Sequence, residues 1–462
     1  MNKNVCTEVV AHNLCIGCGV CAGVCPRGNL EINFNPYGEY NAYETGIGCG
    51  EKCNLCLKVC PFYDCGENED TIGKRLFAEI PEIKHTPETG YYLNTLVGYS
   101  TIDGHRENGA SGGLATWTLE TLLKKGLIDY AACVSPNDDP EKLFSFKICH
   151  TPEDIRNCSR SCYYPVETSE IIQYILQQEG RYAIIGLPCV CKAVRLAMQN
   201  NLKLQERIKF VLGLVCGQTK SNFFVEYICA MGSGTPHHLK AVQFRVKDKN
   251  HSAADFGLRF SCMDGKDGVV FWKEGMNHIW CDRYFTLKTC DFCDDVFAEC
   301  ADAAFMDAWL PGYSKDPKGH NITIVRDRQL TDVFASAIEV GSIYGRDITP
   351  KEVINSQQGV LDIKRGGIRT RQYLAECRGE IVPHKRFHLC KSTLSPIHRQ
   401  LIKLNWEISR NSRHDWFNCN KNLQFFEKKV KFTRLKVKLL QLLERCLHLP
   451  IALLKKMWGK LF

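Results

Sequence analysis

The sequence lacks several features that would each place it in a class of protein. No apolar run approaches the roughly 18 residues that a membrane-spanning helix requires, so we do not expect an integral membrane protein. Histidine is sparse, with 14 copies, and no HExxH motif occurs, so metalloprotease chemistry has no support. A repeat with a period of about 20 to 50 residues is also missing, which excludes a solenoid.

The first residues, MNKNVC, do not have the charged and apolar pattern of an export signal, so we expect a cytoplasmic protein. The cytoplasmic thiol pool reduces most disulfides. The 27 cysteines of this 462-residue chain are therefore better explained as ligands for soft metals or as redox groups. Because 44% of the residues are hydrophobic, the chain can form two or three folded domains.

The formal charge of +8 is unevenly distributed. From Lys385 to the end, 18 Lys and Arg stand against 4 Asp and Glu, a net charge of +14, whereas residues 1–384 carry 41 against 47, a net charge of −6. A nucleic-acid-binding protein usually spreads positive charge over its folded domain. An acidic body with a basic tail does not match that pattern, so we expect no nucleic-acid partner.

The cysteines near the amino terminus occur in two runs of nearly equal spacing. Residues 15–26 read CIGCGVCAGVCP, and residues 49–61 read CGEKCNLCLKVCP, with one extra residue between the first two cysteines. This is the spacing of two-cluster bacterial ferredoxins, in which three close thiolates bind one 4Fe-4S cubane and the fourth binds the other. The predicted ligands of the first cluster are Cys15, Cys18, Cys21 and Cys60, and those of the second are Cys49, Cys53, Cys56 and Cys25. Zinc, or a degraded second site, stays an alternative, although zinc sites usually pair two CxxC motifs across a longer gap.

From about Gly98 the sequence alternates between helical and strand patterns. Residues 111–126 predict a helix that begins at a serine and ends at a glycine, and residues 127–134 predict a buried strand. Two further strands, 181–187 and 208–215, flank a helix over 191–200, which predicts a βαβ unit with parallel strands. The body is therefore expected to be α/β.

Cysteines follow both strands of this unit. Cys189 and Cys216 come where ligands bind in open parallel sheets, beyond the carboxyl ends of the strands. Cys290 and Cys293 in KTCDFCDD would complete a four-thiolate site, which predicts a third 4Fe-4S cluster. The alternative is that Cys189 and Cys216 are ordinary buried thiols. Three further cysteines could replace one of the four: Cys191, Cys281 and Cys300.

Residues 108–113, NGASGG, form a glycine-rich turn before the predicted helix. Amides at a helix start bind phosphate or pyrophosphate well. A plain tight turn is the alternative interpretation.

The tail predicts a basic amphipathic helix. Apolar residues recur at helical spacing at Phe425, Leu435, Leu439, Leu442, Leu443 and Cys446. Lysine and arginine lie beside them, and Pro450 separates a final segment, 451–462, that contains Trp458. This pattern suits an anionic membrane surface, which would place the protein at the inner face of the membrane. Packing against the body or against a partner subunit is the other interpretation.

Several motifs together resemble one family, the beta subunits of coenzyme F-420 hydrogenase and dehydrogenase and their bacterial and plant relatives. They are the two ferredoxin runs, Ser111–Asp129, Ser159–Glu167, Ile185–Cys189, Leu214–Gly217 and Cys290–Pro311. The resemblance implies an iron-sulfur flavoprotein that binds FAD. It also implies that Ser111, Gly112 and Gly113 contact the flavin and that Cys189, Cys216, Cys290 and Cys293 bind the extra cluster. Given a flavin, we expect Ser159 and Arg160 to be nearby donors that tune its charge, and a surface arginine is the alternative.

The function that follows is that of an oxidoreductase. Clusters carry single electrons and flavin carries one or two, so a flavin can join 4Fe-4S clusters to a two-electron acceptor or donor. That acceptor is coenzyme F-420 or an unknown compound, and bacterial relatives suggest a link to surface polysaccharide synthesis. One alternative is an electron-transfer subunit that serves a partner enzyme in a hetero-oligomer and has no substrate chemistry of its own. Another is an iron-sulfur scaffold without flavin.

The predicted organisation has four parts. A ferredoxin module occupies residues 1–70, two segments of the α/β body occupy 71–180 and 181–380, and a basic helical tail occupies 381–462.

Overall fold

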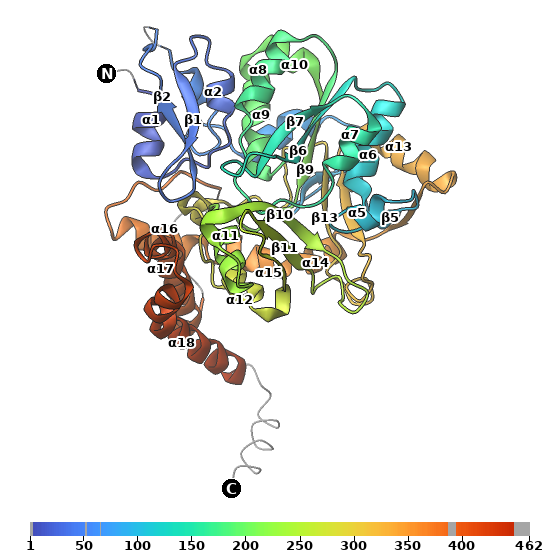
Figure 1. The fold of residues 1–462 in the computed structure, drawn as a ribbon. Helices are drawn as coiled ribbons and strands as arrows, with labels where there is room; N and C mark the ends of the chain where they lie inside the picture. Colours follow the sequence, from blue (N-terminus) through green and yellow to red (C-terminus); the bar gives the residue numbers. More distant parts are fainter. Residues whose placement is uncertain (1–2, 51–52, 65, 387–393, 448–462) are drawn as a thin grey trace.

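The computed structural model describes residues 3–50, 53–64, 66–386 and 394–447, and a mixed eight-stranded sheet forms its centre (Figure 1). In spatial order its strands are β15 (Ile343–Asp347), β5 (Asn94–Ser100), β14 (Asn321–Val325), β13 (Ala303–Asp307), β9 (Ile208–Leu214), β8 (Tyr182–Gly186), β6 (Tyr130–Pro136) and β7 (Phe144–Cys149). The four neighbours β13, β9, β8 and β6 run parallel, and β14 and β7 on either side are antiparallel to them. The α/β fold expected from the sequence is confirmed.

The parallel unit predicted around residues 181–215 is also confirmed. Strand β8 pairs in parallel with β9, and α9 (Pro188–Asn200) connects them. Most of their side chains are buried on both faces, as the largely apolar sequence of a central parallel strand requires. Helix α9 begins at Pro188, where proline fits because the first helical N–H needs no partner within the helix.

Helices cover both faces of the sheet. On one face lie α6 (Leu114–Lys124), α7 (Pro152–Asn157) and α13 (Arg328–Glu339). On the other lie α8 (Ser169–Gln177), α9 and α10 (Leu202–Arg207). Because β5, β6 and β7 come from residues 71–180 and the remaining strands from residues 181–380, both predicted body segments contribute to one sheet.

The ferredoxin module packs on the second of these faces. Its elements are α1 (Val5–Glu8), α2 (Val20–Gly23), β1 (Leu30–Phe34), β2 (Tyr40–Glu44) and α3 (Leu55–Lys58). Helix α2 lies against α8 so closely that a Cβ at Gly23 would come within 2.6 Å of Ile172 Cβ. The Thr168 hydroxyl and its backbone N–H both donate to the Cys18 carbonyl, at 2.7 and 2.9 Å. The module and the body are therefore in direct contact through both polar and apolar groups.

A second hydrophobic core lies beside the sheet. Its antiparallel strands are β10 (Leu239–Val246), β11 (Gly257–Cys262) and β12 (Asp267–Phe271), and its helices are α11 (Phe223–Met231), α12 (Met276–Cys281), α17 (Pro396–Asn418) and α18 (Leu423–Leu447). The remaining elements are α4 (Glu69–Phe77), β3 (Lys84–Thr86), β4 (Gly90–Tyr92), α5 (His105–Asn108), α14 (Pro350–Ser356), α15 (Gln358–Leu361) and α16 (Ile368–Glu376).

The tail forms two helices, α17 and α18, that extend away from the sheet (Figure 1). Helix α18 contacts the second core through Phe426, which stacks on Phe285 at 5.7 Å between ring centroids, and through the buried Val430 and Val437. The predicted apolar stripe lies elsewhere on the helix, because Phe425, Leu435, Leu439, Leu442 and Leu443 are all more than half exposed. Within the described residues, no helix combines the length and apolar character needed to cross a membrane. Pro450 and the segment 451–462 lie outside the described residues.

Candidate functional site

The first cysteine run lies in a tight loop that leads into α2. Gly17 and Gly19 adopt positive φ values of +70° and +81°, and a Cβ at Gly17 would lie 2.6 Å from Tyr40 Cβ. Burial, and then the nearby Cys60 thiolate, raises the pKa of Cys18. Burial, followed by the Cys18 and Cys15 thiolates, raises the pKa of Cys21. Cys60 of the second run thus lies near the first run, as the predicted exchange of ligands requires.

The second set of thiols gathers around Asn29. The Asn29 backbone N–H donates to Cys25 Sγ at 3.3 Å, and its side-chain amide donates to Cys49 Sγ at 3.4 Å. Cys56 lies among them, since burial and then the Cys49 and Cys53 thiolates raise its pKa. Cys25 of the first run therefore lies beside the second run.

The third set meets at the carboxyl edge of the sheet. Cys189 lies in the first turn of α9, Cys216 follows β9, and Cys290 and Cys293 lie in and just after a short 3-10 helix, Lys288–Phe292. Burial, and then the Cys216 and Cys293 thiolates, raises the pKa of Cys189. The Thr219 backbone N–H donates to Cys290 Sγ at 3.2 Å. The four predicted thiols are thus neighbours although more than 100 residues separate the first from the last.

The three cysteines considered as substitutes have other surroundings. Cys191 Sγ is buried against the carbonyls of Gly186 and Leu212, at 3.6 and 3.5 Å. Cys300 is buried, and Glu69 and Asp295 are the charged groups that raise its pKa most after burial. Cys281 is exposed and is the last residue of α12. The geometry therefore favours the four cysteines named from the sequence.

The donor chemistry fits iron-sulfur cubanes. Across the described ranges, no three histidine, cysteine, aspartate or glutamate side chains converge on a position for a single metal ion. Zinc needs four ligands around one ion, whereas each thiolate of a cubane binds a different iron and the sulfurs stand farther apart. The three sets supply four thiols each, which is the number of ligands that three cubanes would need.

A cavity of about 510 Å³ adjoins the third set of cysteines. Its lining includes Cys189 and Cys216, Cys18 from the ferredoxin module, and Ser111 and Gly113 from the glycine-rich turn. Ser159 and Arg160 line it as well. The cavity therefore brings most of the residues predicted to contact a cofactor to the edge of the predicted cluster.

The glycine-rich turn differs in detail from the prediction. Helix α6 begins at Leu114, not at a serine, because Gly113 caps it with a φ of +79° and the Ser111 hydroxyl instead donates to the His320 carbonyl at 2.6 Å. Gly112 is absent from the cavity lining, and a Cβ there would lie 2.7 Å from the Gly98 carbonyl oxygen. Ala115 and Thr116, the next residues of the first turn, do line the cavity.

Ser159 and Arg160 reach the turn from the other side. The Ser159 hydroxyl and Arg160 Nε both donate to the Asn108 carbonyl at 3.0 Å. Arg160 adopts a φ of +98°, which is costly for a residue with a side chain. Their hydrogen bonds hold the turn in place, so these atoms position the cavity wall.

Two cationic residues that the sequence analysis missed lie at the same turn. Arg245, which lines the cavity, donates to the Ala110 carbonyl at 3.0 Å and to Asp307 at 2.8 Å. Lys247 donates to the Ser111 carbonyl at 3.0 Å, and burial lowers its pKa to about 7. Arg245 lies on β10 and Lys247 directly follows that strand, and the sequence motif RVK was their only local signal. The guanidinium of Arg245 beside a helix start favours an anionic ligand in the cavity.

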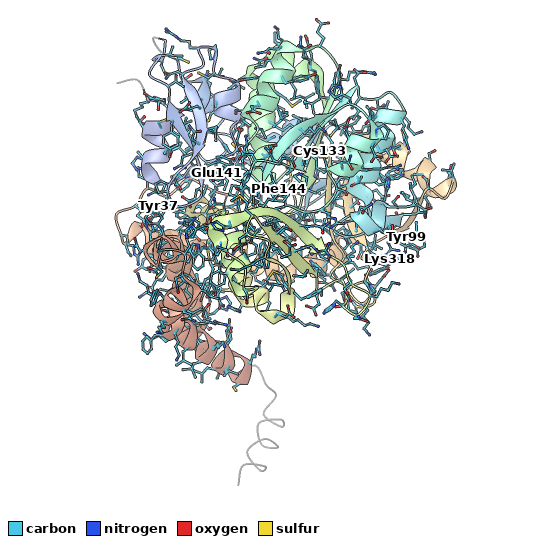
Figure 2. The ribbon with its side chains drawn as sticks, in the orientation of Figure 1. Tyr37, Tyr99, Cys133, Glu141, Phe144 and Lys318 are labelled. Atoms are coloured by element: carbon cyan, nitrogen blue, oxygen red, sulfur yellow. The ribbon has the colours of Figure 1, made fainter. Side chains whose placement is uncertain are left out.

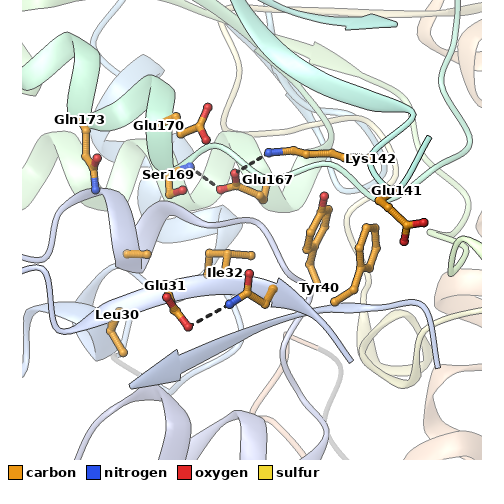
Figure 3. A pocket seen from close by; sticks show the side chains of 13 residues that line it. Leu30, Glu31, Ile32, Tyr40, Glu141, Lys142, Glu167, Ser169, Glu170 and Gln173 are labelled. Atoms are coloured by element: carbon orange, nitrogen blue, oxygen red, sulfur yellow. Dashed lines mark hydrogen bonds and ion pairs between the residues drawn. The ribbon is translucent and has the colours of Figure 1, made fainter. Parts of the chain in front are cut away.

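A second cavity, of about 420 Å³, lies between the module and the body (Figure 3). Glu31 and Tyr40 line it from the module, and Lys142 and Glu167 line it from the body. Glu167 accepts from the Ser169 backbone N–H at 2.6 Å and lies 3.7 Å from Lys142 Nζ. These contacts satisfy the buried carboxylate, so this cavity belongs to the interface that docks the module.

The ferredoxin module and the α/β body both supply sets of cysteines, and these sets meet at a cavity large enough for a cofactor. This arrangement defines an iron-sulfur electron-transfer protein. Two family models described as coenzyme F420 hydrogenase/dehydrogenase, beta subunit, match residues 95–173 (N-term) and 179–351 (C terminus), and a 4Fe-4S binding domain matches residues 8–31. The chain belongs to this family of oxidoreductase beta subunits, as the resemblance implied.

Relatives are found among archaeal proteins. The chain is 25% identical over 222 residues to one subunit of an F(420)H(2) dehydrogenase of Methanosarcina mazei, covering 45% of this chain and 55% of the relative. It is 24% identical over 355 residues to a coenzyme F420-dependent sulfite reductase of Methanocaldococcus jannaschii, covering 72% of this chain and 47% of the relative. The chain thus spans about half the length of these curated relatives. A solved F420-reducing [NiFe] hydrogenase complex from Methanosarcina barkeri contains a chain that is 17% identical, with a TM-score of 0.49, over 63% of this chain and 96% of that one.

The cap of α6 gives a direct test of the turn. Gly113 and Gly126 flank the same helix and both have positive φ, +79° and +63°, but a Cβ at Gly113 would lie 2.7 Å from the His105 carbonyl oxygen whereas Gly126 faces open space. We expect Gly113→Ala to lower the free energy of unfolding by about 2 kcal/mol more than Gly126→Ala, because only the former adds a backbone clash to the strain. Urea unfolding of anaerobically prepared protein, followed by circular dichroism, measures both. Equal losses would mean that the turn relaxes freely.

Proposed function

We propose that this chain is an iron-sulfur flavoprotein oxidoreductase that passes electrons between three 4Fe-4S clusters and one FAD, and onward to a two-electron acceptor or donor. The observation that supports this most is the 510 Å³ cavity, which is bordered at once by the third cysteine set, by the glycine-rich turn and by Arg245. A cofactor in that cavity would stand beside a cluster.

The arrangement of the thiols supports a route for electrons. Cys18 belongs to the first ferredoxin set, and it is among the thiols that raise the pKa of Cys189 after burial. Both residues line the cavity. Electrons entering through the ferredoxin module would therefore reach the third set and the cavity without leaving the protein.

The residues around the cavity suit a flavin dinucleotide. Arg245 and the first turn of α6 would hold the pyrophosphate, because cations and helix-start amides bind anions. Tyr163 and Trp280, packed edge to face at 5.0 Å, both line the cavity and offer apolar rings against an isoalloxazine. When bound, FAD supplies the exchange between one-electron and two-electron chemistry.

The acceptor is proposed from the names of the relatives. Both relatives named above carry coenzyme F420, a deazaflavin that accepts an electron pair, in their names, so a deazaflavin or a similar organic carrier is the proposed partner of the flavin. The link to surface polysaccharide synthesis stays a prediction. The alternative function, an electron-transfer subunit that serves a separate enzyme, is favoured by the name of the first relative, which is one subunit of a dehydrogenase.

Metal content tests the number of clusters. Protein purified without oxygen should contain about twelve irons and twelve acid-labile sulfides per chain, four of each for every cubane. Cys216→Ser should lower both to about eight, because it removes one ligand of the third set. Cys281→Ser is the matched control and should leave the iron content unchanged, since Cys281 lies outside the set. A wild-type value of about eight would eliminate the third cluster, and zinc in place of iron would overturn the assignment of all the cluster ligands.

Flavin binding is best tested by filling the cavity rather than by enlarging Gly112 or Gly113, whose substitution would distort the backbone. Ala115 lines the cavity from the helix and has a normal backbone conformation. We expect Ala115→Phe to lower FAD content at least tenfold with unchanged iron, because the ring occupies the space of the cofactor. Absorbance and released FAD measure the effect.

Ala115→Ser controls for the substitution itself, and it should retain flavin. Flavin bound to Ala115→Phe at the wild-type level would show that FAD lies elsewhere. In the wild-type protein, flavin reduction by a one-electron donor followed by turnover with an added deazaflavin would favour the enzyme. Reduction without turnover would favour the electron-transfer role.

The exposed stripe on α18 supports a peripheral contact with an anionic membrane. Leu435, Leu439 and Leu442 are more than half exposed, and Lys436 and Lys438 lie between them. Apolar side chains that enter the interface beside cations that meet anionic headgroups bind such surfaces. The opposite side of α18 packs on the second core, so the helix would present the stripe without unfolding.

Vesicle binding tests this contact in the full-length chain. Changing Leu435, Leu439 and Leu442 to glutamine should reduce co-sedimentation with phosphatidylserine vesicles by about tenfold or more, since each buried methylene contributes to membrane binding. Val340→Gln with Met263→Gln is the control, because both residues are exposed and apolar but lie far from α18 in the sequence. If the wild type and both variants co-sediment with the vesicles equally, the membrane contact is contradicted, and a partner subunit would be expected to cover the stripe.

A further inference from the structure

Three thiols that belong to none of the cluster sets lie together at one side of the cavity. Cys133 lies on β6, Cys149 ends the neighbouring strand β7, and Cys158 follows α7 (Figure 2 labels Cys133). The antiparallel register pairs Ala131 with Cys149 and Cys133 with Lys147, so Cys133 and Cys149 are diagonal neighbours on one face of the sheet. Helix α7 packs across that face and brings Cys158 Sγ to 3.6 Å from Cys149 Sγ.

The three thiols differ in their access to the cavity. Cys158 and Cys133 line it, next to Ser159 and Arg160. Cys149 is fully buried behind them. The arrangement thus has two thiols facing the cofactor space and one sheltered thiol, Cys149, whose Sγ lies 3.6 Å from Cys158 Sγ.

The surroundings prepare Cys158 for thiol chemistry. Hydrogen bonds from Cys133 and then Cys149 lower the pKa of Cys158 to about 4, while the pKa of Cys133 is raised. A thiolate beside a protonated thiol is the starting arrangement for making or breaking a disulfide. These three sulfurs do not form a site for a single metal ion, since the described residues include no such group.

We propose that Cys149 and Cys158 form a dithiol–disulfide couple that exchanges an electron pair with the flavin in the adjoining cavity. This inference rests on the proposed function, because the flavin is the oxidant or reductant. In the oxidising direction the two Sγ atoms form one S–S bond and release their protons. The two electrons pass to oxidised flavin, which takes up protons to become reduced flavin. In the other direction, the S–S bond takes up an electron pair from reduced flavin and breaks, and the Sγ atoms of Cys149 and Cys158 take up the protons that the flavin releases.

The geometry permits this step with small movements. The two sulfurs must approach from 3.6 Å to a bonding distance of about 2.05 Å, a short movement that rotation about the side-chain bonds supplies. The couple would add a site that stores two electrons between flavin turnovers, and a substrate with a disulfide or another thiol-reactive group could then draw on it.

The test counts thiols at a known state of the flavin. Wild-type protein is made without oxygen and its FAD content is measured. The protein is then fully reduced, and redox mediators set its flavin to either the oxidised or the reduced state. Free thiols are alkylated and the peptides are quantified by mass spectrometry. We expect labelling of Cys149 and Cys158 to fall at least tenfold when the flavin is oxidised and to recover when it is reduced.

Cys229 and Cys262 provide a matched pair in the same molecule. Their sulfurs are 3.5 Å apart and buried in the second core, and neither residue lines the cavity. The labelling of Cys229 and Cys262 should be the same whether the flavin is oxidised or reduced. The Ala115→Phe protein, without flavin, should keep Cys149 and Cys158 reduced under the same conditions.

Each outcome has one meaning. Flavin present with Cys149 and Cys158 labelled equally in both states overturns the couple and leaves the proposed function standing. If Cys149 and Cys158 are oxidised to the same extent in Ala115→Phe as in wild type, the couple is also overturned, because their electrons would then not pass to flavin. Wild-type protein without any FAD overturns the proposed function and this inference together. If Cys158→Ser folds, its reductive titration should require two fewer electrons per chain than that of wild type, and an equal requirement contradicts the couple.

Discussion

The parallel pairing of β8 with β9 is the constraint on which the rest of the site depends. Their register, with Gly186 opposite Gly213, ends both strands at one edge and delivers Cys189 and Cys216 to the same place. Gly213 also permits a close approach from outside the sheet, since a Cβ there would lie 2.3 Å from Ala298 Cβ. The segment that follows Cys290 and Cys293 can therefore pack directly on the strand. Arg326, fully buried, donates to the carbonyls of that segment at Phe297, Ala298 and Ala301 and keeps it there.

Buried cations around the third cysteine set follow from the same packing. Lys364 Nζ donates to the Cys216 carbonyl at 3.0 Å, and although burial opposes it, the Cys293 and Cys216 thiolates hold its pKa above the usual value. Arg371 donates to the Asp291 carbonyl at 2.8 Å, between Cys290 and Cys293 in sequence. Isolated cations are costly in a protein interior. Beside thiolates they instead offset negative charge that the site would otherwise accumulate.

The parts of the site that could be predicted are those encoded in short stretches of sequence. Cysteine spacing and continuous apolar strands are local patterns, so the ferredoxin runs, the βαβ unit and the cysteines after its strands were recognisable. The start of α6 was predicted wrongly at a serine, because a left-handed glycine such as Gly113 can cap a helix when the serine hydroxyl finds a partner elsewhere. Arg245 and the thiols near Cys133 reach the cavity from distant strands. Their positions depend on how the second core and α7 pack, which no local pattern specifies.

The docking of the ferredoxin module has a kinetic consequence. The module is joined covalently to the body and is held against α8 by the Gly23 contact and by the two hydrogen bonds from Thr168 to the Cys18 carbonyl. Donor and acceptor centres held together in this way need no diffusional encounter. Transfer between them is first order, so its rate does not fall on dilution and does not respond to ionic strength as the meeting of two charged proteins would. Only the exchange of electrons with molecules outside the chain, at the module and at the two-electron acceptor or donor, is left as a collision.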